Sequence, residues 1–386
     1  MVFFSSYVYF INNKIYNIRI SYCQILLIIK YTIFTFLTTL YCFGFGCRTS
    51  EMPPTVSKNR GILKPIKKSP SDQLRQLVSD LLLKSGRFSD DVIENLIQEL
   101  PHKWERHGDL IVIPQRSLRD ANWKIVEKEI FQIICETLKI SRIARKNPVK
   151  PDSYRSSNIE LLWGNNGIVH HVDNKIRYQW DITKCMFSIG NITEKLRIAR
   201  FDCSNEVVVD LFAGIGYFTL PYLIHAKARY VHACEMNPDS VEALKLNLKS
   251  NGVDDRCTVH FGDNRTTAPS NVADRVNLGL IPSSELSWET ACLALKNDFG
   301  GVLHIHANID SKTPKTEQKN RTNIPQFKYA EWELWTKYAA STIEQILLRL
   351  KSCKWKVAVL HLEHVKSYAP HVDHVVLDVE CRPNVG

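Results

Sequence analysis

The chain has no C-x-x-C pair, although it contains eleven cysteines among its 386 residues. Pairs at that spacing mark structural zinc sites and thiol redox motifs. Cys234, Cys257 and Cys292 stand instead within apolar runs, where thiols are normally buried and reduced. A zinc site and a disulfide framework are therefore disfavoured, and a cytoplasmic location is expected.

The first 47 residues lack alanine, aspartate, glutamate, proline, histidine and tryptophan. They are rich in residue types with AT-rich codons, which indicates a translated non-coding leader, with Met52 as a natural start. The alternative is a transmembrane anchor, because Cys23–Phe45 is apolar enough to span a bilayer. No membrane partner is expected unless that segment is a real part of the protein.

The third glycine of a dinucleotide-binding fingerprint is also missing. A β-branched run ends in Asp210, a turn with Gly214 and Gly216 follows, and a second strand ends in Glu235. Thr219 stands where an NAD or FAD site needs glycine, so dinucleotides are disfavoured. The spelling D-L-F-A-G-I-G-Y-F is instead that of a site for S-adenosyl-L-methionine (AdoMet).

Acidic and amide side chains at two strand ends are candidates for AdoMet contacts. Glu235 is placed to accept both ribose hydroxyls, and Gly214 and Gly216 let the backbone pass close to the methionine part. Asp263, followed by Asn264, ends the third strand, where an acid commonly reads the adenine amino group. The alternative for Asp263 is a helix N-cap.

A polar segment precedes the first strand of this unit. Ser188 can donate a hydrogen bond to a carboxylate, and Lys195 can pair with one, such as that of the AdoMet methionine tail. From the residues alone, a capped helix start and a solvated lysine are equally consistent.

The formal charge of +10 suits a nucleic-acid partner without requiring one. Basic residues gather in one Pro-interrupted stretch: Arg142, Arg145, Lys146, Lys150 and Arg155. They are either a phosphate-binding surface or a solvated loop.

Hydrophobic periodicity predicts the elements of the first half. Helices are expected at 71–84, at 89–100 with Ser89 as N-cap, and at 123–140, with strands at 109–114 and over 159–181 around a hairpin turn at Asp173-Asn174. The second half alternates strand and helix, with strands at 207–211, 230–234, 257–261, 275–280, 302–306, 356–363 and 375–380, and a helix at 329–350.

This pattern predicts an α/β, class I AdoMet-dependent methyltransferase-like (Rossmann-type) seven-stranded sheet with an N-terminal α+β accessory domain. Four parts are expected: a doubtful apolar leader (1–51), a flexible basic arm (52–70), the accessory domain (71–183) and an AdoMet-binding catalytic domain (184–386). His304 and His306 share one strand face, which is either core or cleft. Four further histidines suggest no metal site, because they lack a supporting ligand pattern: His361, His364, His371 and His374.

Several segments resemble the tRNA wybutosine-synthesising protein 2 family, and the match covers about residues 101–383. They are LPHKWERHGDLIVIP, KCMFSIGNITEK, VVVDLFAGIGYFTLPYLIHA, VHACEMNPDSVEALKLNL, FGDNR, ADRVNLGLIPSSELSW and EHVKSYAPHVDHVVLDVECRP. Close relatives of that family are the tRNA guanosine-37 N1-methyltransferases.

The resemblance implies transfer of the 3-amino-3-carboxypropyl group of AdoMet, a co-substrate, to C7 of 4-demethylwyosine at position 37 of phenylalanine tRNA. It makes the anticodon loop of that tRNA the expected partner. It also marks AdoMet-binding positions, each present here: Ser188, Lys195, Glu235, Asp263 and Asn264. No catalytic base is identified, and Asp210 is a candidate by location only.

One departure separates this chain from the methyltransferases. Those enzymes carry N-P-P-Y or N-L-P after the fourth strand, whereas this chain has Gly279-Leu280-Ile281-Pro282. The missing amide favours the aminocarboxypropyl reaction, and Ser283 or Ser284 either contacts the base or belongs to a plain loop. The alternatives are a tRNA guanosine-37 N1-methyltransferase and a non-catalytic RNA-binding protein on the same fold.

Overall fold

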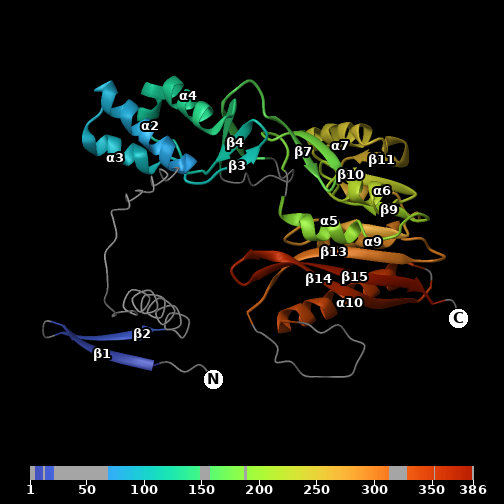
Figure 1. Ribbon diagram of the computed structural model, residues 1–386. Helices are drawn as coiled ribbons and strands as arrows, with labels where there is room; N and C mark the ends of the chain where they lie inside the picture. The colour runs from blue at the N-terminus through green and yellow to red at the C-terminus, as the bar shows by residue number, and fades with distance from the viewer. Residues whose placement is uncertain are drawn as a thin grey trace, which may run out of the picture. The chain divides into compact units, whose positions relative to one another are not determined.

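The computed structural model describes residues 5–11, 14–20, 68–147, 157–186, 189–312, 328–351 and 353–384, the first two ranges by their backbone only. The chain divides into two compact units, Met1–Ile66 and Lys67–Gly386 (Figure 1). In the first unit, β1 (Ser5–Ile11) pairs antiparallel with β2 (Lys14–Ile20).

The candidate membrane segment, Cys23–Phe45, lies outside the described residues. Among the helices that are described, none is both long and apolar enough to cross a bilayer.

The second unit begins with three helices and a four-stranded sheet of order β3-β4-β5-β6. The elements are α2 (Pro70–Ser85), α3 (Asp90–Gln98), β3 (Glu105–His107), β4 (Leu110–Ile113), η1 (Ala121–Val126), α4 (Glu127–Leu138), β5 (Arg142–Lys146) and β6 (Ile159–Trp163). Ser69 caps α2 by accepting a hydrogen bond from the Asp72 amide, and Gly86 ends that helix in the left-handed conformation. Ser89 is the N-cap residue of α3, as expected, although its side chain makes no capping bond.

The basic stretch at 142–146 is not a solvated loop. It is strand β5, and its cations are used within the fold. Arg142 pairs with Asp109 at 2.6 Å, and the buried Arg145 pairs with Glu160 at 2.9 Å. The interpretation of this stretch as a loop was wrong, because its charged side chains obscured the strand pattern of the two buried apolar residues that lie between the arginines. Lys150 and Arg155 lie outside the described residues.

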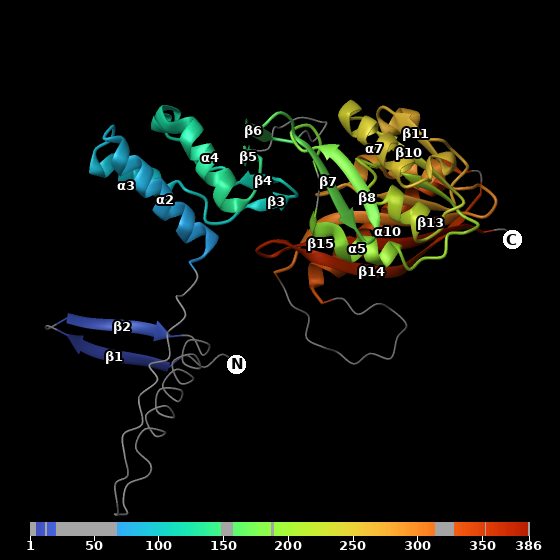
Figure 2. The same cartoon turned by 45° about the horizontal axis from the view of Figure 1, so that its top comes forward.

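A two-stranded hairpin follows, β7 (Ile168–Asp173) and β8 (Ile176–Asp181). Its turn lies at Asn174 and Lys175, one residue later than expected, because both residues adopt positive φ (46° and 64°). The Gln179 amide donates to Asn247 Oδ1 of α7 at 2.7 Å, so the hairpin packs on the larger sheet's helices (Figure 2).

The larger sheet has seven strands in the order β11-β10-β9-β12-β13-β15-β14. The first five are parallel, whereas β15 runs antiparallel between β13 and β14. Its strands are β9 (Val207–Asp210), β10 (Tyr230–Glu235), β11 (Cys257–Phe261), β12 (Arg275–Leu278), β13 (Gly301–Asp310), β14 (Trp355–Ala369) and β15 (Val372–Pro383). The predicted methyltransferase-like fold is confirmed, although the last three strands are longer than expected.

Helices cover both faces of this sheet. They are η2 (Ile189–Asn191), α5 (Ile192–Ile198), α6 (Thr219–Ile224), α7 (Pro238–Ser250), η3 (Asp254–Arg256), α8 (Asn264–Thr267), η4 (Glu285–Ser287), α9 (Trp288–Ala294) and α10 (Ala330–Leu350). Val208 packs in one core with Leu244 of α7, whereas its neighbour Val209 packs in another with Ile343 of α10. Successive side chains of this buried strand point to opposite faces of the sheet, so the strand contributes to two cores. The carboxyl ends of the parallel strands meet at one edge, where ligands bind in open α/β sheets.

Candidate AdoMet site

The glycine turn after β9 is tied directly to the acid that ends β10. The Gly214 amide donates to Glu235 Oε2 at 2.8 Å, and the Asn237 amide donates to Oε1 at 2.7 Å. Gly214 and Gly216 have φ of +56° and +102°, which favours glycine at both positions. Burial raises the pKa of Glu235, although these amides oppose the shift. Each carboxylate oxygen keeps a second lone pair, so two hydroxyls of a ribose can still be accepted.

Asp210, at the end of β9, is a buried residue whose carboxylate links neighbouring elements of the fold. Its carboxylate accepts hydrogen bonds from Thr219 Oγ1 at 2.7 Å and from Asn277 Nδ2 at 3.0 Å. It thereby joins β9 to α6 and β12. Thr219, which replaces the third glycine of a dinucleotide site, is the partner that the sequence alone did not identify. The side chain of Asp210, the candidate base by location, is therefore engaged within the fold through both oxygens.

The end of β11 lies beside the end of β10, since the Gly262 amide donates to the Glu235 carbonyl at 2.9 Å. Asp263 caps α8 by accepting from the Arg265 amide, and the Arg265 guanidinium lowers the pKa of Asp263. The buried Asn264 donates to the Leu211 carbonyl at 3.1 Å. Its Oδ1 finds no partner among the described residues, so it retains an acceptor for a ligand.

Lys195 is brought to the glycine turn from α5. Its Nζ lies 2.9 Å from Asp173 Oδ2 and 6.0 Å from the ring of Tyr217. Burial lowers the pKa of Lys195, while Asp173 opposes that shift. Lys195 is therefore a buried cation and not the solvated lysine of the alternative interpretation. Ser188 lies outside the described residues.

Gly279 has a physical reason to lack a side chain. A Cβ at this position would fall 2.9 Å from Phe218 Cε2 and 3.1 Å from Asn277 Nδ2. The ring of Phe218 therefore occupies the space that a side chain at 279 would enter. Two nearby serines serve the loop itself: Ser284 is buried and accepts from Trp288 Nε1, and Ser283 Oγ accepts from the Glu285 amide.

Restoring the amide by Gly279→Asn is expected to destabilise the protein by about 1–3 kcal/mol, because Phe218 must move to admit it. It is not expected to create methyl transfer to guanosine. Denaturant unfolding and a methyl-label assay on unmodified tRNA measure the two effects. Appearance of methyl transfer at wild-type stability would contradict this account of Gly279.

A buried ionic network holds α5 against the sheet. Arg197 pairs with Glu194 at 2.7 Å and with Asp378 of β15 at 2.5 Å, and Asp378 also contacts His304 Nδ1. His304 is thus a core residue. Burial of Asp378 opposes its ionisation, yet His304 and Arg197 hold its pKa well below the ordinary value of 3.8.

This network makes stability sensitive to acid. A carboxylate with a depressed pKa in the folded state stabilises the protein above its unfolded pKa, and that contribution is lost as pH falls. We expect the free energy of unfolding to decrease steadily below about pH 4. Denaturant unfolding between pH 6 and 3 measures this free energy, and Asp378→Asn should reduce the slope of its dependence on pH. An unchanged slope in that variant would contradict the assignment.

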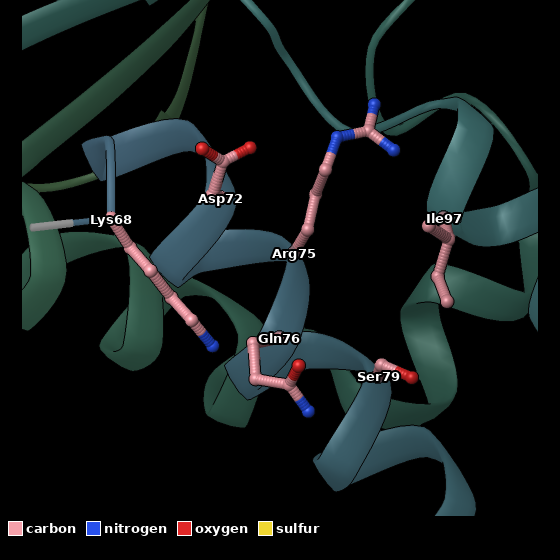
Figure 3. A pocket seen from close by; sticks show the side chains of 6 residues that line it. All are labelled: Lys68, Asp72, Arg75, Gln76, Ser79 and Ile97. Atoms are coloured by element: carbon pink, nitrogen blue, oxygen red, sulfur yellow. The ribbon is translucent and has the colours of Figure 1, made fainter. Parts of the chain in front are cut away.

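Two surface hollows on the described residues lie away from these side chains. One has a volume of about 480 Å³. Figure 3 shows the residues that line it: Lys68, Asp72, Arg75, Gln76, Ser79 and Ile97. Another is lined by Val207, Arg229, Tyr230, His232 and Val272. Neither includes a candidate AdoMet residue, so the strand ends remain the candidate site.

The residues present fit AdoMet. Glu235 retains lone pairs that can accept the ribose hydroxyls, and Asn264 Oδ1 retains an acceptor for a polar edge of the ligand. Lys195 supplies a buried cation for the methionine carboxylate. Among the described residues no group of three or more histidine, cysteine or acidic side chains is arranged to hold a metal ion.

Two family models match this chain. The model of the TRM5/TYW2 methyltransferase domain matches residues 169–329, and that of the TYW2 N-terminal domain matches residues 87–167. A tRNA wybutosine-synthesizing protein 2 homolog from Bos taurus is 48% identical over 314 residues, covering 74% of this chain and 72% of the relative. The homolog from Danio rerio is 48% identical over 316 residues, covering 79% and 76%.

Solved structures show the same likeness. TYW2 from Pyrococcus horikoshii in complex with MeSAdo is 28% identical, with a TM-score of 0.58, and covers 80% of this chain and 99% of its own. TYW2 from M. jannaschii in complex with AdoMet is 25% identical, with a TM-score of 0.51, covering 73% and 100%. The homologs from Bos taurus and Danio rerio are each 48% identical and cover more than two thirds of this chain, and the chain belongs to the tRNA wybutosine-synthesising protein 2 family.

Proposed function

We propose that this protein transfers the 3-amino-3-carboxypropyl group of AdoMet to C7 of 4-demethylwyosine at position 37 of phenylalanine tRNA, releasing methylthioadenosine. Family membership supports an AdoMet-dependent tRNA transferase of wybutosine synthesis. The observation that carries the choice of group is the Phe218 ring beside Gly279, because it excludes the amide that guanosine-37 methyltransferases place there.

The proposed AdoMet contacts divide by the part of the molecule they hold. Glu235 accepts the ribose hydroxyls, and Asp263 with Asn264 contacts the adenine. Gly214 and Gly216 allow backbone to approach the methionine part, and two further residues hold its carboxylate: Ser188 and Lys195. The expected division into residues 71–183 and 184–386, and the cytoplasmic location, remain part of this proposal.

Which group is transferred depends on geometry, because the sulfonium activates all three carbon atoms bonded to its sulfur. The C7 π electrons form the new bond to Cγ, the Cγ–S bond breaks, and sulfur keeps its electron pair. When Lys195 pairs with the methionine carboxylate, it fixes the position of the methionine tail. Cγ, and not the methyl group, then lies in line with C7. The buried walls around Lys195 and Phe218 exclude water from that encounter.

Lys195→Met is expected to raise the Kd for AdoMet by roughly 10- to 100-fold, since hydrogen bonds to charged groups contribute about 1.5–3 kcal/mol. Equilibrium binding measures it. Lys184→Met is the matched control, because Lys184 lies in the same segment but pairs with Asp239 at the surface. Equal loss of affinity in both variants would contradict the role of Lys195.

The nature of the small product tests the reaction itself. Protein, AdoMet and tRNA carrying 4-demethylwyosine should yield methylthioadenosine in amounts equal to the modified tRNA. S-adenosylhomocysteine in its place would identify a methyltransferase. AdoMet binding with no product of either kind would indicate the non-catalytic alternative.

A further inference from the structure

Two histidines form a buried pair that the AdoMet contacts do not use. His306 of β13 and His374 of β15 are each 1% exposed, and His306 Nδ1 lies 3.1 Å from His374 Nε2. One nitrogen must donate to the other. In either tautomer, one outer nitrogen then carries a lone pair and the other carries a proton. Among the residues that the structure describes, neither outer nitrogen has a hydrogen-bond partner.

The strand neighbours of the pair contact η2 on one side and the loop after β12 on the other. On one side, His374 is opposite Lys366 in the β14–β15 register, and a Cβ at Gly190 of η2 would meet Lys366 Nζ. Gly190 follows the candidate carboxylate-binding position Ser188 by two residues. Lys366, the register neighbour of His374, therefore reaches η2, which follows the segment expected to hold the methionine tail.

On the other side, the pair adjoins the loop after β12. His374 is opposite Asn308 in the β13–β15 register, and the Asn308 amide donates to the Pro282 carbonyl at 2.8 Å. The ring of His306 lies 5.0 Å from that of Phe218, which fills the space beside Gly279. His306 of the pair therefore contacts Phe218, the residue beside Gly279.

Further polar atoms in this region lack partners among the described residues. They are Asn191 Oδ1 of η2, Asn277 Oδ1 of β12 and Asn308 Oδ1 of β13. Buried polar atoms without partners are costly, and substrate groups can satisfy them when bound. These three amide oxygens are hydrogen-bond acceptors that the edge of a heterocyclic base can satisfy.

We propose that the His306–His374 pair accepts the proton that leaves C7 of the acceptor base. This inference rests on the proposed function. After C7 has bonded to Cγ, the C7–H bond breaks, its electrons restore the aromatic ring, and the proton moves to the imidazole lone pair. The pair then carries the proton as an imidazolium, and solvent water takes that proton when the product leaves.

The electrostatics keep the pair neutral before the reaction. Burial lowers the pKa of His374 to about 4, with Lys366 and His364 acting in the same direction. Burial and the neighbouring His374 hold the pKa of His306 well below its ordinary value, as do His304 and Arg197, whereas Asp378 opposes the shift. A neutral imidazole presents the lone pair that proton removal needs.

The test uses the full chain with tRNA bearing hydrogen or deuterium at C7 of 4-demethylwyosine. We expect His306→Gln and His374→Gln to slow single-turnover transfer by at least about 100-fold at saturating AdoMet. AdoMet affinity should be unchanged. Transfer by the variants should also show a larger C7 deuterium isotope effect than the wild type, because proton removal becomes rate-limiting.

His232→Gln is the matched control. His232 and His260 form a similar pair, with 3.0 Å between Nδ1 and Nε2, on β10 and β11. This variant should keep the wild-type rate and isotope effect. If His306→Gln does not fold, as shown by lost AdoMet binding, His374→Gln provides the same test.

Variants that keep the rate within threefold, or lose it without any increase in the isotope effect, would overturn the proposal. The second result would assign the pair a structural role. A wild-type protein that transfers methyl instead would overturn the proposed function, and this inference with it.

Discussion

Replacing Glu235 by glutamine is expected to weaken AdoMet binding by roughly 100-fold, because two charge-assisted hydrogen bonds to the ribose are damaged. The side chain now accepts from the amides of Gly214 and Asn237, one on each oxygen. A glutamine can satisfy only one of these donors. Its NH2 group would face the other N–H, so one of the two hydrogen bonds to this side chain at the end of β10 would also be lost.

Equilibrium binding of AdoMet to Glu235→Gln measures this effect. Glu289→Gln is the control, because Glu289 forms an exposed ion pair with Arg349 and lies outside the candidate site. The control should bind AdoMet like the wild type. A Kd for Glu235→Gln within threefold of the wild-type value would contradict the ribose role.

Arg197→Met is expected to lower the free energy of unfolding by about 3–5 kcal/mol, since it leaves two buried carboxylates without their cation. Glu194 is fully buried, and Asp378 is 7% exposed. The same guanidinium contacts both, so methionine replaces its volume but none of its hydrogen bonds. Because α5 carries Lys195 on its other side, AdoMet affinity should fall as well.

Denaturant unfolding of Arg197→Met gives the stability change. Arg349→Met removes an arginine from a surface pair with Glu289 and should cost only about 0–1 kcal/mol. Equal, small losses in the two variants would show that the buried network contributes little, and would remove the argument that it positions α5.

The sheet could be predicted because its signals are local. Val207–Asp210 and Cys257–Phe261 are short apolar runs between turn residues, and both are strands with nearly the expected bounds. The order glycine turn, helix, strand and acid was also expected from the sequence, whereas the hydrogen bond from Gly214 to Glu235 was not. The AdoMet roles of these residues remain predictions.

Other features could not be predicted because they depend on contacts between distant segments. Arg197 and Asp378 are 181 residues apart in the chain, and nothing in either neighbourhood indicates a pair. The same holds for Phe218 beside Gly279, and for His306 with His374. Strand β5 was missed for a local reason, since its charges resemble those of a loop.

Group transfer from doubly labelled AdoMet tests the central claim most directly. Full-length protein would be incubated with tRNA carrying 4-demethylwyosine and AdoMet labelled either in the carboxyl carbon or in the methyl group. The account predicts that carboxyl label enters the tRNA, while methyl label leaves as methylthioadenosine. Methyl label in the tRNA would contradict it, because the Phe218 ring beside Gly279 would then not exclude methyl transfer.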